Sequence, residues 1–159
     1  MILNKLERLI DKYLALFSGR KVSEENLKYI EDMLDIVLPE DFKAIANVYD
    51  GYEEIAGQSL FSFDPNIEDW NVVSKTLFYR ESDCNLPARY LALREESENF
   101  VVLETQPIAT ETARVIWCSL SDAYNLEDIR KMEDNPIIFP SFADYFGYLI
   151  NEEEQMRKG

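Results

Sequence analysis

The sequence predicts an α+β protein in which helices pack against an antiparallel sheet of about four to six strands. Three observations lead to this fold class. Apolar residues recur at helical spacing towards both ends of the chain, whereas short β-branched and aromatic segments fill the middle. The length of 159 residues, 47% of them hydrophobic, fits a single core, so residues 1–159 are expected to form a single domain.

Two amphipathic helices are expected at the start of the chain. The first runs from Leu3 to Phe17 and ends at Ser18 and Gly19. Its apolar face consists of Leu3, Leu6, Leu9, Ile10, Tyr13, Leu14 and Phe17. Ser23 can cap the second helix, because its hydroxyl can accept a hydrogen bond from a free N–H of the first turn. The second helix carries its own stripe of Leu27, Ile30 and Leu34.

A third helix is predicted from Leu38 to Tyr49. Pro39 suits the first helical position, where its missing N–H costs nothing. Glu40 and Asp41 then lie in the first turn, where the helix dipole favours negative charge. Gly51 can adopt the left-handed conformation that ends a helix. The predicted core-facing residues are Phe42, Ile45, Ala46 and Tyr49.

The segment after Gly51 is harder to assign. Ser59–Phe63 is short, apolar and aromatic, which indicates a strand, and Asp64 and Pro65 indicate a turn. The spacing of Ile67, Trp70, Val73 and Leu77 favours a helix from about Asn66 to Tyr79. Val72 and Val73 suit a strand equally well, so periodicity leaves both possibilities open.

The second half supplies the predicted sheet. Strands at Arg89–Arg94 and Phe100–Leu103 are joined by the polar loop Glu95–Asn99, and Thr112–Cys118 adds a third strand. Ser119–Pro136 is polar and acidic, and we expect a surface excursion that is the most mobile part of the chain.

The last helix has a clear start signal. Ser141 precedes Asp144 by three residues, as in a capping box. The apolar face that follows consists of Phe142, Tyr145, Phe146, Leu149 and Ile150.

The composition excludes several classes of catalysis. Because the chain has no histidine, it lacks Ser-His-Asp and Cys-His triads and histidine-ligated zinc. No glycine-rich phosphate loop or calcium-binding loop is present. Cys84 and Cys118, the only cysteines, are expected to be free thiols. We therefore expect no catalytic residue, no metal site and no cofactor.

Charge gives the strongest indication of a partner. The net charge is -15, and residues 24–70 hold 13 acids against only Lys28 and Lys43. Nucleic acids and anionic membranes would be repelled, whereas a basic protein would be attracted. The N-terminus is charged and no apolar run is long enough to span a bilayer, so we expect a cytoplasmic protein without a signal peptide.

Several short motifs resemble the SUKH superfamily of Smi/Knr-like domains. The matching pieces are Ile30–Glu31, Leu38–Lys43, Tyr49–Gly51 and Ser141–Phe146, spread over most of the chain from about Leu6 to Ile150. Two departures concern the loop after the third helix. Asp50 stands where the family commonly has asparagine, and Tyr52 follows Gly51 where a second glycine is frequent.

The resemblance implies a mixed α+β domain and, for bacterial members, an immunity protein that neutralises a cognate toxin, often a nuclease. For fungal relatives it implies a regulatory protein-binding role. The acidic balance agrees with the first function, because toxins that act on nucleic acid need basic surfaces. A regulatory adaptor of the same fold is the alternative. An enzyme that uses paired carboxylates is a third, for which no specific constellation is present.

The predicted partner-binding residues are acids and aromatics of one stretch. They are Asp50, Tyr52, Glu53, Glu54, Glu68, Asp69 and Trp70. Tyrosine and tryptophan are enriched at interface hot spots. A purely structural interpretation competes for each of them: Trp70 at helical spacing is more often a core residue, Tyr52 could cover the helix end, and the acids could simply be solvated.

Overall fold

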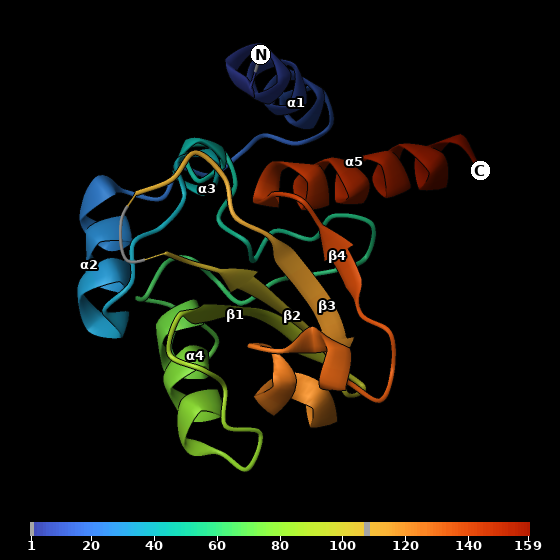
Figure 1. Ribbon diagram of the computed structural model, residues 1–159. Coiled ribbons are helices and arrows are strands. Elements are labelled where there is room, and N and C mark those ends of the chain that lie inside the picture. Colours follow the sequence, from blue (N-terminus) through green and yellow to red (C-terminus); the bar gives the residue numbers. More distant parts are fainter. Residues whose placement is uncertain (1, 107–108) are drawn as a thin grey trace.

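A four-stranded antiparallel sheet forms the centre of the computed structural model, which describes residues 2–106 and 109–159. Its strands are β1 (Tyr90–Glu96), β2 (Asn99–Glu104), β3 (Val115–Ser119) and β4 (Ile137–Phe139). They lie in the order β1-β2-β3-β4, and each strand runs antiparallel to its neighbour (Figure 1). The predicted α+β class is confirmed, with a sheet at the lower end of the expected size.

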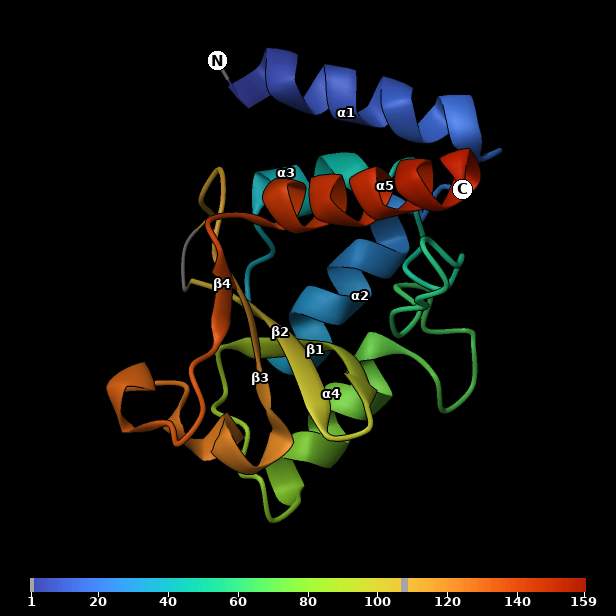
Figure 2. The same cartoon turned by 90° about the vertical axis from the view of Figure 1, so that its right-hand side faces the viewer.

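The described part of the chain has five α-helices: α1 (Ile2–Leu16), α2 (Glu24–Leu34), α3 (Glu40–Ile45), α4 (Val72–Glu81) and α5 (Phe142–Lys158). Helices α1 and α5 lie side by side and run in the same direction (Figure 2). Lys5 pairs with Asp144 near their starts, and Lys12 pairs with Glu154 further along. Helix α3 packs against both, and α4 packs on β1.

Two predicted helix caps are confirmed. The Ser23 hydroxyl accepts the Asn26 N–H at 3.1 Å and begins α2. The Ser141 hydroxyl accepts the Asp144 N–H at 3.0 Å and donates to the Asp144 carboxylate at 2.8 Å, so Ser141 caps the start of α5. The predicted first helix matches α1, although the side chain of Leu3 lies outside the described residues.

The third helix is shorter than predicted. Pro39 is extended (φ -64°, ψ 153°) and precedes the helix instead of opening it, so α3 begins at Glu40. After Ile45 the backbone tightens, because the N–H groups of Asn47 and Val48 bond to carbonyls three residues back. Gly51 therefore lies beyond the helix end that it was expected to form.

The segment between α3 and α4 contradicts two predictions. Residues 59–63 form no strand, since Ser62 makes only an isolated bridge with Asn71 and the chain bends at Phe63. Helix α4 begins at Val72 and not at Asn66, because Asp69 has a positive φ of 62° that a right-handed helix does not allow. Asn71 caps α4 by accepting the Ser74 N–H at 2.9 Å.

The sheet has a tighter hairpin than predicted, and one of its four strands lies where the sequence indicated none. Asn99 pairs with Glu96, so β1 and β2 are joined by two residues instead of five. Ser97 (φ 51°) and Glu98 (φ 68°) both take the left-handed conformation that a two-residue hairpin turn requires. Strand β4, which was not predicted, pairs its three residues with β3.

An aromatic cluster joins the helices above the sheet. Tyr13 of α1 lies against Phe146 of α5, with ring centroids 5.3 Å apart, and Phe42 of α3 lies against Phe142 at 4.8 Å. Phe63, from the segment that follows Gly51, lies 4.6 Å from Phe42. All five rings are fully or almost fully buried. The cluster therefore holds together α1, α3, α5 and one part of the α3–α4 connection.

The excursion after β3 contains two short 3-10 helices, η1 (Leu120–Asn125) and η2 (Ile129–Lys131). It is anchored by buried Ala123 and Leu126, and the Asp122 carboxylate accepts the N–H of Glu133 at 3.0 Å. Its expected mobility stays a prediction. No helix among the described residues is long and apolar enough to cross a membrane.

Candidate protein-binding site

The connection between α3 and α4 carries every predicted partner-binding residue. It lacks regular structure but is tied down by backbone hydrogen bonds. Leu60 and Phe63 donate to the carbonyls of Gly51 and Asp50, both at 2.8 Å, and Phe61 donates to Leu93 of β1 at 2.7 Å. The connection is therefore folded back on itself and fixed to the edge of the sheet.

Helix α5 holds the turn in the middle of this connection. Ile55 and Gln58 exchange backbone hydrogen bonds of 2.9 and 3.0 Å around the turn at Ala56 and Gly57. The Glu153 carboxylate of α5 accepts the Ala56 N–H at 2.7 Å. The loop tip is thus positioned by a side chain almost one hundred residues further along the sequence.

Asp50 shapes the loop. Its side chain is only 8% exposed, and its carboxylate accepts the Glu53 N–H at 3.0 Å. Such a bond from an aspartate to a following N–H stabilises a turn locally. A direct contact with a partner is limited to the small exposed part of Asp50.

Tyr52, Glu53 and Glu54 line an open recess of about 400 Å³. Tyr52 is 48% exposed, so it does not simply cover the end of α3. Among the described residues, Arg20 is the one base in its lining, which Asp50 and Ser59 complete.

Glu68, Asp69 and Trp70 occupy the turn before α4. All three are exposed, and Trp70 keeps 41% of its surface accessible, which rules out the alternative that it is a core residue. The Phe61 ring meets Trp70 edge-on at 5.3 Å, and the Lys75 ammonium lies 4.8 Å from the indole centroid. Trp70 is therefore both exposed and fixed.

A second recess, of about 300 Å³, connects these two groups. Its lining comprises Gly57, Ser59, Phe61, Trp70, Arg94, Glu95 and Glu96. Because Ser59 lines both recesses, the Tyr52 group and the Trp70 group border one continuous surface, which we call the Tyr52–Trp70 surface. Glu95 and Glu96 were not predicted as site residues, since only the tight hairpin turn extends β1 far enough to include them.

The carboxylates of this surface are mostly unpaired. Within residues 2–106 and 109–159, the side chains of Glu53, Glu54, Glu68 and Asp69 make no ion pair or hydrogen bond. These four carboxylates outnumber the bases beside them, Arg20 and Lys75, so the surface has a negative potential.

Comparison with protein families decides the classification. The model of the SMI1/KNR4 family (SUKH-1) matches residues 21–147, which is most of the chain. The chain belongs to the SMI1/KNR4 family. A search of curated proteins found no significant match. Proteins of SUKH families are generally related to toxin immunity and generally non-catalytic.

Residues of the SMI1/KNR4 motifs lie where two helices meet. The Asp41 carboxylate accepts the N–H of Phe42 and, across the molecule, the N–H of Ala143 in the first turn of α5, both at 2.9 Å. Burial raises the pKa of Asp41 to about 6, and the nearby charge of Asp144 raises it further. The two hydrogen bonds act in the opposite direction, because they stabilise the ionised carboxylate, but burial outweighs them. Asp41 thus joins α3 to α5.

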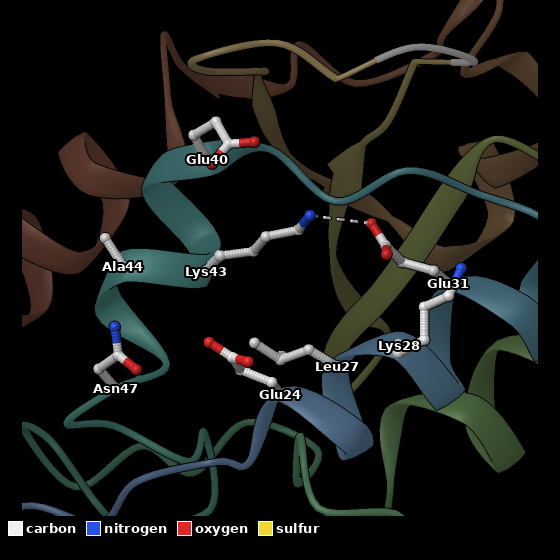
Figure 3. A pocket seen from close by; sticks show the side chains of 8 residues that line it. All are labelled: Glu24, Leu27, Lys28, Glu31, Glu40, Lys43, Ala44 and Asn47. Carbon is white, nitrogen blue, oxygen red and sulfur yellow. Dashed lines mark ion pairs between the residues drawn. The ribbon is translucent and has the colours of Figure 1, made fainter.

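Glu31 performs a similar task between α2 and α3. Its carboxylate accepts the Leu38 N–H at 2.8 Å and pairs with Lys43 at 3.3 Å. The two helices border an open recess of about 550 Å³ (Figure 3). Its lining mixes the acids Glu24, Glu31 and Glu40 with the bases Lys28 and Lys43, and Leu27, Ala44 and Asn47 complete it. Charges here are interspersed, unlike those of the Tyr52–Trp70 surface.

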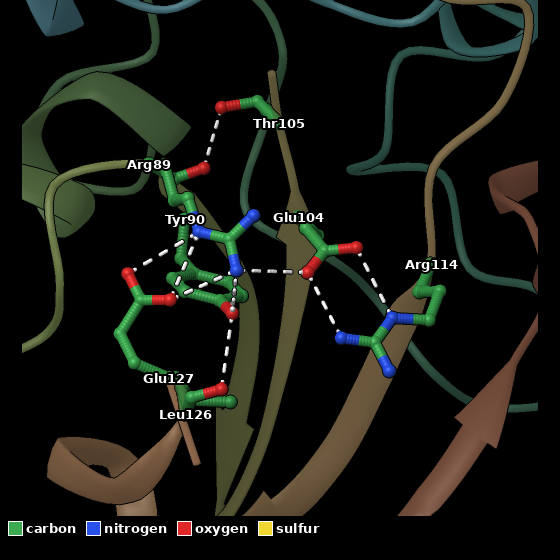
Figure 4. Close-up of polar contacts among 7 residues, drawn as sticks. All are labelled: Arg89, Tyr90, Glu104, Thr105, Arg114, Leu126 and Glu127. Atoms are coloured by element: carbon green, nitrogen blue, oxygen red, sulfur yellow. Dashed lines mark hydrogen bonds and ion pairs between the residues drawn. The ribbon is translucent and has the colours of Figure 1, made fainter. Parts of the chain in front are cut away.

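A third polar cluster lies beside the sheet (Figure 4). Glu104 forms a two-bonded pair with Arg114, at 2.9 and 3.1 Å, and Arg89 bridges Glu104 to Glu127. Burial opposes ionisation of Glu104, but the two arginines outweigh burial and hold the pKa of its carboxyl below the usual value. Because each charge has an opposite partner, the cluster ties β1, β2 and β3 to the excursion after β3.

Within the described residues, no three His, Cys, Asp or Glu side chains come close enough to hold a metal ion. Cys84 and Cys118 are both free thiols, as predicted.

Proposed function

We propose that this SMI1/KNR4 protein is a non-enzymatic immunity protein that binds and neutralises a cognate toxin domain with a basic surface, such as a nuclease. The observation that carries the proposal is the group of unpaired carboxylates, Glu53, Glu54, Glu68 and Asp69, around two exposed aromatic side chains on one fixed surface. The general relation of SUKH families to toxin immunity supports it.

Electrostatics explains how such a surface would work. Domains that act on nucleic acid carry basic surfaces that match the phosphate backbone. An acidic inhibitor attracts them over a distance, which raises the association rate more than it raises the final affinity. The net charge of -15 adds to this attraction from the rest of the molecule.

The aromatic side chains supply the short-range part of binding. Tyrosine and tryptophan bury large, stiff surfaces at small entropic cost and dominate many interfaces. Tyr52 and Trp70 are roughly half exposed, and the loop that carries them is held by backbone bonds before any partner arrives. Little ordering cost is expected on binding.

The test is a neutralisation assay with the toxin domain encoded next to this gene. Adding the protein should abolish toxin activity at a one-to-one ratio, and the affinity should fall as salt rises from about 0.05 M to about 0.5 M, because salt screens exposed charges. An undiminished toxin activity, or an affinity that does not respond to salt, would contradict the proposal. The absence of any toxin gene nearby would favour the regulatory adaptor instead.

A further inference from the structure

The recess beside Trp70 combines an exposed aromatic face with carboxylates on its border. It measures about 300 Å³ and is open to solvent, against about 30 Å³ for one water molecule in the liquid. Trp70 and Phe61 line one part of it, and the end of β1 lines another. It therefore has room for a long side chain.

The aromatic rings of this recess already attract a cation. The Lys75 ammonium lies 4.8 Å from the Trp70 centroid and 5.5 Å from the Phe61 centroid. A cation within about 6 Å of a ring face is stabilised by the ring quadrupole, and tryptophan is the strongest such partner. Trp70 keeps 41% of its surface accessible beside Lys75. The indole can therefore receive a second contact from outside.

The lining of the recess holds two carboxylates, Glu95 and Glu96, against the guanidinium of Arg94, with the Lys75 ammonium over its rings. Glu68 and Asp69, exposed next to Trp70 in the sequence, give the surroundings their excess of negative charge. Arg94 pairs with Glu96 at 2.5 Å and is mostly covered, with 11% of its side chain exposed. Glu96 itself is 69% exposed at its side chain. Glu95 has no basic partner among the described residues; its carboxylate accepts the Glu98 N–H at 3.2 Å and the Tyr79 hydroxyl at 3.5 Å. The Glu95 carboxylate is thus held by two hydrogen bonds, whereas Glu96 keeps most of its side chain in solvent beside Arg94.

We infer that this recess receives an arginine side chain of the partner, whose guanidinium stacks on Trp70 and pairs with Glu95 and Glu96. The inference rests on the proposed function and specifies its chemistry at one point of the Tyr52–Trp70 surface. Arginine fits better than lysine because its planar guanidinium can stack on an indole and donate to two carboxylates at once.

The test needs no toxin and uses Trp70 as its own reporter. The chain has two tryptophans, so Trp117→Phe leaves Trp70 as the only indole fluorophore. A hexa-arginine peptide and a hexa-lysine peptide are titrated separately into this variant, and binding is followed by Trp70 fluorescence and by the NMR signal of its indole N–H. Hexa-arginine should bind roughly three- to tenfold more tightly than hexa-lysine.

Three further variants locate the arginine. Glu95→Gln and Glu96→Gln should each weaken hexa-arginine binding roughly threefold or more, because each removes a charge and keeps the side-chain shape. Glu98→Gln is the matched control, since Glu98 lies in the same hairpin turn but does not line the recess. It should leave the affinity almost unchanged.

Equal affinity for the two peptides, or equal effects of all three substitutions, would overturn the inference. An unchanged Trp70 fluorescence and indole N–H signal during the titration would also overturn it. The two proposals can fail separately. A toxin that binds through the four unpaired acids while Trp70 stays silent contradicts only the arginine recess. A recess that prefers arginine, in a protein that neutralises no toxin, contradicts only the immunity function.

Discussion

Helix α3 and the connection that follows it are both acidic and adjacent in sequence, yet the carboxylates that matter in each are used differently. Around α3, Asp41 accepts two backbone N–H groups and Glu31 accepts one and pairs with Lys43. In the connection, Glu54 and Glu68 point to solvent with no partner in the described part of the chain. The contrast teaches that the contacts of an acidic residue, and not the number of acids around it, show whether it stabilises the fold or is available to a partner.

Gly51 separates the two regions and offers the strongest way to disturb one of them. A Cβ added there would lie 2.7 Å from the Phe63 ring and 2.8 Å from the Phe61 carbonyl, at a φ of 82°. Gly51→Ala should destabilise the protein by roughly 3–5 kcal/mol, as left-handed strain and core displacement add. Denaturant unfolding measures this change.

Gly57→Ala is the control for backbone strain alone. Gly57 has a similar φ of 74°, but nothing lies within 4 Å of its added Cβ. Its substitution should cost about 1 kcal/mol. Equal losses at both glycines would show that close packing around Gly51 does not matter.

Asp41→Ala tests the structural role of the α3 acids. It leaves the Phe42 and Ala143 N–H groups buried without an acceptor, so the free energy of unfolding should fall by about 2–4 kcal/mol. Glu40→Ala, at the exposed neighbouring position, should change it by less than about 0.5 kcal/mol. A similar loss for both variants would contradict the division between the two regions.

The pH dependence of stability gives a second test of Asp41. Burial raises the pKa of Asp41 to about 6, above its unfolded value of 3.8, so the folded state binds more protons between these values. The contribution of Asp41 to the free energy of unfolding is complete below about pH 4. It is lost as the pH rises through about 6, and the total loss is roughly 2–3 kcal/mol. The measured quantity is the free energy of unfolding of wild type minus that of Asp41→Asn from pH 4 to 7. This difference should decrease with pH, and a flat or rising curve would contradict the burial argument.

Glu153→Ala tests whether α5 positions the partner-binding loop. The substitution removes the acceptor of the Ala56 N–H and the ion pair with Arg157, which lies at 2.6 Å. A global loss of about 1 kcal/mol is expected, together with faster hydrogen exchange at Ala56. Glu152→Ala, one position earlier and exposed, should change neither quantity. An unchanged hydrogen-exchange rate at Ala56 would mean that the loop keeps its conformation without Glu153.

Local signals in the sequence predict most of the fold. The caps at Ser23 and Ser141 and the apolar stripes of α1, α2 and α5 depend on neighbouring residues, so they can be read directly. Strand β4 has only three residues and exists because β3 offers it an edge, which no local pattern indicates.

The errors in the candidate site have the same origin. Ile67 and Trp70 have helical spacing, but the turn at Asp69 depends on the Ser62 N–H, which bonds to the Trp70 carbonyl at 2.9 Å. The hairpin turn at Ser97 and Glu98 uses left-handed residues without the usual glycine or asparagine. Sequence reasoning therefore named the Trp70 group but missed its neighbours Glu95 and Glu96, which depend on strand register.

The most direct test of the binding surface compares two charge-matched variants. One changes four acids of the Tyr52–Trp70 surface to lysine: Glu53, Glu54, Glu68 and Asp69. The other changes four exposed acids elsewhere: Glu7, Asp11, Asp83 and Glu133. Both raise the net charge by the same amount, so any difference between them reports position and not total charge.

The decisive quantity is the association rate constant with the toxin domain at low salt. The surface variant should associate roughly 10- to 100-fold more slowly than wild type, whereas the control variant should lose much less. Equal rates for the two variants would contradict the claim that the unpaired acids between Glu53 and Asp69 guide a basic partner to this surface.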